Sequence, residues 1–202
     1  MLDILKIGLK LLDMKLESSK KFYEDITQKF QEKKSILEKR YNEEEVGEES
    51  FEDIRDTLVD DYQEQQEFEN LASMLVVSHN YFILEYFLKL LVRNLLKQKG
   101  DPKFERYKNL YMEDIAKFFK KKGILFINIQ GYSDCNILRL LVNDIKHNGA
   151  RVSRRLAKAK GEPFNENEIK EIKIFPDEVD KYSEAIRVFY GNLINRVITG
   201  KP

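Results

Sequence analysis

The polar residues that could do chemistry gather in one segment, NILRLLVNDIKHNGARVSRR, over residues 136–155. If this segment is a helix with about 100° per residue, four polar side chains share one stripe about 100° wide. Apolar side chains fill the remaining arc, and Asp144 falls among them, where a buried carboxylate needs a partner. The four residues of the stripe, our candidate catalytic residues, are His147, Asn143, Arg139 and Lys146.

A stripe of this composition suits one reaction. A histidine with a near-neutral pKa can exchange protons with a ribose 2′-hydroxyl or a leaving 5′-oxygen. A neighbouring guanidinium or ammonium can stabilise the extra negative charge on a phosphate. The stripe therefore predicts RNA cleavage by internal attack of the 2′-hydroxyl without a metal. The alternative is the polar face of an ordinary amphipathic helix, whose C-terminal dipole favours Lys and His.

Further charged residues could assist this stripe. A basic segment follows it directly and either tracks a phosphate backbone or is a solvated loop. Glu85 and Lys89, spaced i and i+4, either support the site or form an intrahelical ion pair. Arg93 is a candidate partner for the carboxylate of Asp144. The candidate nucleic-acid-binding residues of the basic segment are Arg151, Arg154, Arg155 and Lys158.

Several other classes of site are excluded by the sequence. It has no P-loop, no Rossmann fingerprint and no His-Glu-x-x-His motif. Two histidines are too few for a histidine-rich metal site, and the single Cys135 excludes an internal disulfide and a cysteine-based zinc site. We therefore expect neither a metal nor a cofactor at the candidate site.

Composition predicts the kind of element that positions these residues. Of 202 residues, 42% are hydrophobic and 35% are charged, with only nine Gly and four Pro. Such a mixture is typical of long solvated helices and argues against a β-sandwich, which needs frequent turns. Basic and acidic residues balance at 35 each, so no global field points to a nucleic acid or a membrane. The predicted fold class is all-α.

The apolar spacing places the individual helices. Steps of three and four residues from Leu5 to Leu37 predict a helix of about forty residues, which is either a bundle helix or a self-pairing or partner-binding one. A wide apolar arc over residues 71–96 predicts a central helix that is too often charged to span a bilayer. Shorter helices are expected at 110–122, 134–148 and from Pro176 onward. The segments ILFINIQ and EIKIF are expected to pair as a minor two-strand element.

Two segments, VNDIKHNG and SHNYFILEYFLKLLVRNLL, resemble the HEPN superfamily of prokaryotic helical domains. The resemblance implies a bundle of four or five helices that is commonly dimeric. Many such domains are metal-independent RNases of toxin–antitoxin and phage-defence systems, and others bind nucleotides or act as scaffolds. Their motif is an Arg, usually a polar residue, and a His after four to six residues. Asn143 and His147 fit this motif, whereas Val142 precedes Asn143 and seven residues separate Arg139 from His147.

Together these patterns define the expected protein. Residues 1–49 form a long coiled-coil-like N-terminal helix, and residues 50–202 form a HEPN-like helical bundle. The expected function is metal-independent RNA cleavage or RNA binding in a prokaryotic toxin or phage-defence setting. The alternative is a non-catalytic adaptor or scaffold that mediates protein–protein interaction or dimerisation. We expect a cytoplasmic homodimer, with RNA and an antitoxin or another protein as candidate partners, and no membrane partner.

Overall fold

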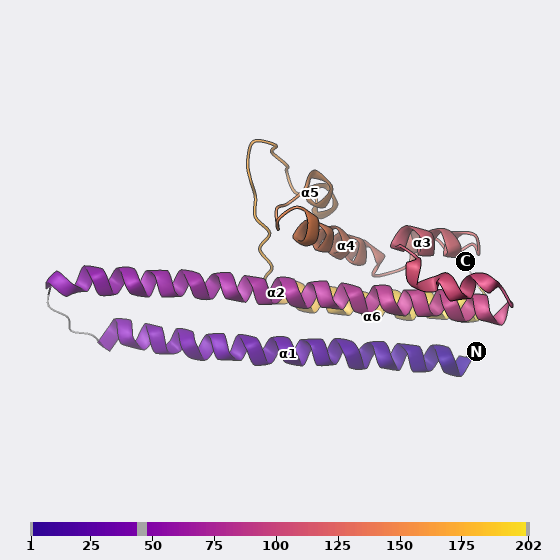
Figure 1. The fold of residues 1–202 in the computed structure, drawn as a ribbon, viewed down its shortest axis with the longest axis horizontal. Helices are drawn as coiled ribbons and strands as arrows, with labels where there is room; N and C mark the ends of the chain where they lie inside the picture. Colours follow the sequence, from indigo (N-terminus) through magenta and orange to yellow (C-terminus); the bar gives the residue numbers. More distant parts are fainter. Residues whose placement is uncertain (1, 44–47, 201–202) are drawn as a thin grey trace.

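The computed structural model describes residues 2–43 and 48–200, and these residues form helices without a strand (Figure 1). This confirms the all-α fold class. Two long antiparallel helices run the length of the molecule, with the shorter helices on one side of them and α6 behind (Figure 1). In chain order the elements are α1 (Leu2–Glu43), α2 (Glu48–Gln98), the 3₁₀ helix η1 (Pro102–Asn109), α3 (Met112–Lys120), the 3₁₀ helix η2 (Phe126–Asn128), α4 (Tyr132–His147), α5 (Arg154–Lys160) and α6 (Pro176–Thr199).

The centre of the fold is α2. It contacts α1, η1, α3, α4 and α6, and its residues Val77, Leu84 and Leu88 are completely buried. At 51 residues it is longer than α1 with 42, which corrects the expectation that the N-terminal helix is the long element. The physical reason is that residues 48–98 contain neither Gly nor Pro, so nothing interrupts the helix before Gly100.

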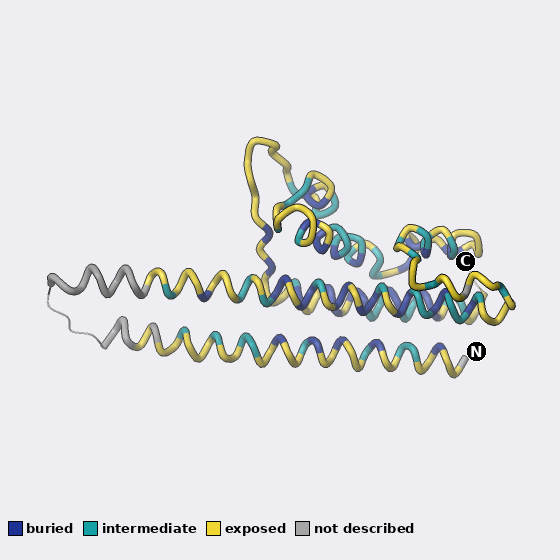
Figure 2. Tube along the Cα trace, viewed as in Figure 1, coloured by how far each residue is buried: buried dark blue, intermediate teal, exposed yellow. Residues whose placement is uncertain are grey.

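The apolar stripe of α1 packs within the chain, as the bundle-helix interpretation predicts. Leu5, Leu12 and Leu16 are buried in the common core with α2 and α6 (Figure 2). Further along, the hydroxyls of Tyr23 and Ser73 are hydrogen bonded across α1 and α2 at 3.0 Å. The side chain of Leu37, the last residue of the predicted stripe, lies outside the described residues.

The expected two-strand element is wrong. The first of the two segments contains the 3₁₀ turn η2 instead of a strand, because the ring of Phe126 packs against Phe119 and Phe189 at centroid distances of 5.5 and 5.1 Å. The segment from Glu171 onward is extended, but it makes only an isolated antiparallel bridge, with Arg151, in the described part of the chain. Its neighbour is therefore the turn after α4 and not η2.

One segment of α2 is long and apolar enough to cross a membrane by length and composition, Val59–Gln98. This is weak evidence, because a buried core helix passes the same test and much of this segment is core in the present fold. The search covers the described residues.

At Gly131, the N-cap of α4, the chain lies close to the backbone of α6. Its φ of +86° lies in the left-handed region. A Cβ at this position would lie 2.7 Å from the carbonyl oxygen of Ala185 and 2.8 Å from the amide nitrogen of Phe189. Both are backbone atoms of α6, so neither can rotate away as a side chain would.

Replacing Gly131 by Ala should lower the free energy of unfolding by about 3 kcal/mol, the sum of left-handed strain and overpacking. Gly161→Ala is the matched control, because Gly161 has a φ of +73° and no atom near the position of its Cβ; its loss should be about 1 kcal/mol. Urea denaturation followed by circular dichroism measures both values. Equal losses would contradict the close approach of α4 and α6.

Candidate nucleic-acid interface

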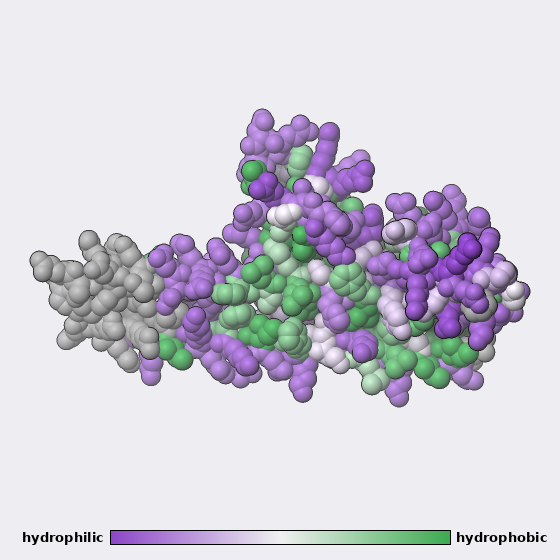
Figure 3. All heavy atoms as spheres, viewed as in Figure 1, coloured by the Kyte–Doolittle hydropathy of each residue, from purple (hydrophilic) through white to green (hydrophobic). Residues whose placement is uncertain are grey.

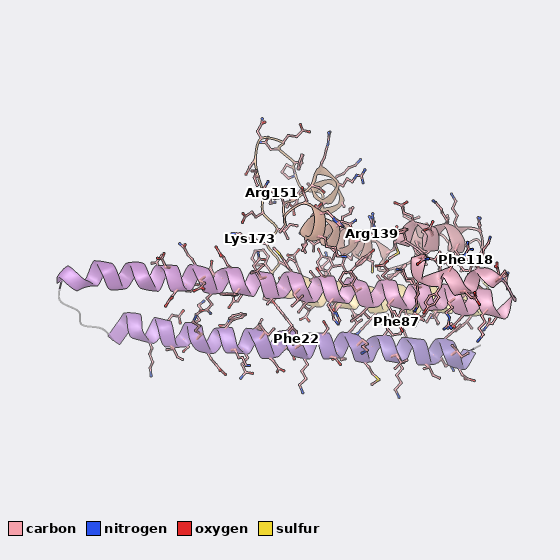
Figure 4. All side chains as sticks on the ribbon, viewed as in Figure 1. Phe22, Phe87, Phe118, Arg139, Arg151 and Lys173 are labelled. Atoms are coloured by element: carbon pink, nitrogen blue, oxygen red, sulfur yellow. The ribbon has the colours of Figure 1, made fainter. Side chains whose placement is uncertain are left out.

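The amphipathic pattern of α4 places the predicted polar stripe at the surface. Its apolar residues, among them Leu138, Leu141 and Val142, are buried in the core that α4 shares with α2 and α6. The opposite side carries the stripe, on which Arg139 is half-buried (Figure 4). The other three members, which are exposed, are Asn143, Lys146 and His147.

Arg139 and His147 lie at different heights on α4. Both Nε and one Nη of Arg139 donate to the Oδ1 of Asn136, at 3.3 and 3.1 Å, which holds the guanidinium toward the start of the helix. Eight residues of helix correspond to about 12 Å along the axis. The fold therefore brings His147 and Arg139 to one face but does not bring them to one phosphate.

Lys146 connects the stripe to α2. Its ammonium lies 3.9 Å from the ring centroid of Phe82, a distance typical of a cation–π contact. On the same helix, Lys89 and Glu85 form an intrahelical ion pair with an N–O distance of 2.9 Å. This contact agrees with the ion-pair interpretation of these two residues.

Tyr81 is buried next to the polar stripe, where its surroundings shift the pKa of its phenol. Burial and the nearby carboxylate of Glu85 raise the pKa of its phenol, and the positive charge of Arg139 opposes this shift. The phenol therefore stays protonated at neutral pH and cannot act as a base.

Asp144 organises the turn that follows α4. Its carboxylate is buried and accepts a hydrogen bond of 2.8 Å from the backbone N–H of Ser153. The hydroxyl of Ser153 in turn caps α5 by accepting from the N–H of Leu156. The expected pairing with Arg93 is wrong, since Arg93 lies over the ring of Tyr107 at 5.1 Å. The buried carboxylate takes a backbone donor as its partner and so fixes where α5 starts.

An extended segment ties this turn to α2. The N–H of Val152 donates to Lys170, and the N–H of Ile172 donates to Ala150, at 2.9 and 2.8 Å. The side chain of Asn70 on α2 holds the same segment through both of its polar atoms. It donates to the carbonyl of Ile172 at 3.1 Å and accepts from the N–H of residue 174 at 3.0 Å.

Asn70 is a positioning residue that the sequence reasoning missed. The sequence shows only a polar amide just before the apolar segment of α2. It does not show that residues 172 and 174 lie opposite Asn70, because these positions are about a hundred residues away in the chain.

The basic segment lies exposed on and before α5, where Figure 4 labels Arg151. Arg154 approaches Glu166 at 3.7 Å, but both side chains are largely exposed, so the ion pair is weak. Lys160 is different, because its ion pair with Glu178 at 3.1 Å ties α5 to α6. Within the described residues no ion pair involves the other predicted binding residues, Arg151, Arg155 and Lys158.

Two other groups are unsuited to chemistry. Burial raises the pKa of the Cys135 thiol, which makes it a poor nucleophile. His79, the other histidine of the chain, is exposed on α2, away from the polar stripe of α4. No group of three or more His, Cys, Asp or Glu side chains that could hold a metal occurs among the described residues.

No protein-family model, curated protein or solved structure matches this chain.

Asn70→Ala should loosen the turn that carries the basic residues, because it removes two hydrogen bonds and leaves backbone groups unpaired. We expect a loss of about 2 kcal/mol in stability and faster hydrogen exchange at the amide of Ile174. Asn143→Ala is the control, since Asn143 is exposed on α4. Unchanged protection of the Ile174 amide in Asn70→Ala would show that Asn70 does not hold this segment.

Proposed function

We propose that the surface formed by the end of α4, the following turn and α5 binds RNA. The observation that carries this proposal is the exposed basic segment next to His147, three of whose four cations make no ion pair in the described part of the chain. Cations that are exposed and unpaired are available to phosphate oxygens, and binding then releases counterions from the RNA.

Two further observations support this function. The turn is held by Asp144, Ser153 and Asn70, so the cations stand on a fixed backbone and less entropy is lost on binding. The resemblance of residues 78–96 and 142–149 to HEPN domains supports a HEPN-like bundle, and with it a cytoplasmic prokaryotic toxin or phage-defence setting.

The binding function predicts a salt dependence. Four phosphate contacts to single-stranded RNA should give a slope of about −3 in a plot of log K against log salt concentration. Arg155→Gln should weaken binding and reduce that slope by about 0.7. Lys10→Gln, an exposed cation on α1, should change neither, and fluorescence anisotropy with a labelled RNA measures both. Equal effects of the two substitutions would contradict a localised site.

A second candidate function is metal-independent RNA cleavage, favoured by the exposure of His147 beside these cations. The imidazole would exchange a proton with the 2′-hydroxyl or the leaving 5′-oxygen, and a cation would stabilise the charged phosphate.

If the protein cleaves RNA, cleavage should persist in EDTA and leave 2′,3′-cyclic phosphate ends. His147→Ala should abolish it, whereas Arg139→Ala should change it little, because Asn136 holds the guanidinium of Arg139 away from His147 along α4. His79→Ala is the matched control, because it removes the other histidine of the chain from a different helix. Loss of all cleavage on chelation would contradict this mechanism and would indicate a metal bound by carboxylates instead.

The alternative function, a non-catalytic adaptor or scaffold, is favoured by exposed apolar side chains along α1 and α2. Wild-type protein that neither binds nor cleaves several RNAs would favour the scaffold over the RNA-binding function.

A further inference from the structure

The outward side of α1 carries an apolar strip that no element of the described residues covers. Leu5, Leu12 and Leu16 of α1 are buried in the core. With about 100° per residue, five other large apolar side chains of this helix fall in a separate arc about 80° wide. Each of them is between 46% and 57% exposed. These residues, the outer strip, are Ile4, Ile7, Leu11, Met14 and Phe22.

The outer strip is continuous over the first half of α1. Ser18 is the polar residue that falls within its arc, and the Ser18 hydroxyl donates to the carbonyl of Met14 at 2.9 Å, so this hydrogen bond stays within the helix. Asp25 and Glu32 are exposed on the same face of the turns after Phe22, so the strip ends there. Figure 3 shows apolar atoms among hydrophilic ones along the edge of the molecule that α1 forms.

The area of the outer strip fits a shallow contact. Five large side chains at about half exposure leave roughly 500 Å² of apolar surface. A patch of this size is at the upper end of those found on monomeric proteins and is often functional. It is smaller than the surface of about 800 Å² that each partner of a standard protein complex buries. An interfacial helix, in contrast, enters a membrane surface by only about 5–10 Å.

The fold turns the acids of this part of α1 toward α6. Residues 3–22 hold three acids. The guanidinium of Arg187 on α6 lies 3.7 Å from the carboxylate of Asp13 and also forms an ion pair with Glu17. Asp3 is therefore the acid that remains to balance cations on the outward side.

Lysines stay on the outward side. Lys20 pairs with Asp180 of α6 at 3.1 Å, but the other four lysines of residues 3–22 are exposed and form no ion pair within the described part of the chain. Three of them border the outer strip within about 40° on the helix, one along one side and two along the other. The four unpaired lysines are Lys6, Lys10, Lys15 and Lys21. The outward side of α1 is thus apolar in the middle and positively charged at its borders.

We propose that the outer strip of α1 binds the surface of an anionic lipid membrane, with the helix parallel to that surface. The apolar side chains enter the boundary between headgroups and acyl chains, and the lysines extend along this boundary to the lipid phosphates. This departs from the expectation of no membrane partner, which rested on the balanced charge of the whole chain. The fold directs the acids and the lysines of α1 to different sides, so the local charge differs from the global one.

A partner helix in a coiled coil is the competing occupant of the outer strip. The strip follows heptad spacing from Ile4 to Met14, but the next two seam positions are Ser18 and Lys21. Heptad spacing predicts a coiled coil where it lasts at least about three or four heptads. Two heptads with flanking lysines fit a lipid surface better, because such a surface requires no register.

The position of α1 in the fold allows this contact. Figure 1 shows α1 along one long edge of the molecule, with α3, α4 and α5 on the other side of α2. A flat surface can therefore contact residues 4–22 without meeting these helices. Membrane binding through α1 does not depend on RNA binding, and the experiments below contain no RNA.

The first experiment measures binding to lipid vesicles by cosedimentation. The protein should sediment with vesicles of phosphatidylcholine and phosphatidylglycerol in equal parts. Binding to vesicles of phosphatidylcholine alone should be at least about tenfold weaker, because the lysines then lack anionic partners. High salt should weaken the binding to the anionic vesicles. No binding to anionic vesicles overturns the proposal, and so does equal binding to both kinds.

The second experiment assigns the binding to the outer strip. Leu11→Glu should weaken binding to the anionic vesicles at least about tenfold, because it places an acid at the centre of the strip. Replacing Lys10 and Lys15 together by Gln should weaken it about twentyfold, which corresponds to about fivefold for each lysine. Circular dichroism of these variants should match the wild type, since all three side chains are exposed.

Ile127→Glu is the matched control, because it adds the same charge at a side chain on η2 that is 78% exposed. It should leave vesicle binding unchanged. Wild-type affinity in Leu11→Glu, or in the double lysine variant, overturns the proposal.

The third experiment reports which side of the molecule contacts the lipid. The chain contains no Trp, so one introduced Trp is the sole source of its signal. The emission of Leu11→Trp should shift to shorter wavelength when anionic vesicles are added, because the indole enters the boundary between headgroups and acyl chains. The emission of Ile127→Trp should stay unchanged. Equal shifts in the two variants, or none in Leu11→Trp, overturn the proposed orientation of α1 on the membrane.

Discussion

The whole structure depends on the burial of one helix, α2. Sheets are absent from the described residues, so the core arises where other helices cover the apolar arc of α2. Its fully buried residues, such as Leu84 and Leu88, lie in one core with side chains of α1, α4 and α6. Because this burial is the main favourable contribution to folding, the shorter helices are held at the places where α2 offers apolar surface.

Buried polar groups fix the register of these helices, which apolar contacts alone leave loosely defined. The amide of Asn80 on α2 donates to the hydroxyl of Ser183 on α6 at 2.9 Å, and the side chain is fully buried. Tyr23 and Ser73 do the same between α1 and α2. Each contact has a geometric requirement, and a buried polar group without its partner is costly. One helical step along either partner would therefore leave these groups unpaired.

The basic surface and the exposed apolar surface lie on different parts of the molecule. The exposed cations lie after α4, on a turn held by Asp144 and Asn70. Most of the exposed large apolar side chains lie along the two long helices. The ammonium of Lys146 lies over the ring of Phe82, so the polar stripe of α4 adjoins the apolar surface of α2 at this point.

Sequence periodicity and composition determined the all-α class, the long helices, the start of α6 at Pro176 and the polar stripe of α4, because these depend on local spacing along one helix. The tertiary structure decided the rest. It placed the 3₁₀ turn η2 where a strand was expected, gave Asp144 a backbone partner in place of Arg93, and left Leu75 and Phe82 uncovered. Spacing shows which side chains share a face, but only packing between distant segments decides what covers that face, and this information is not local.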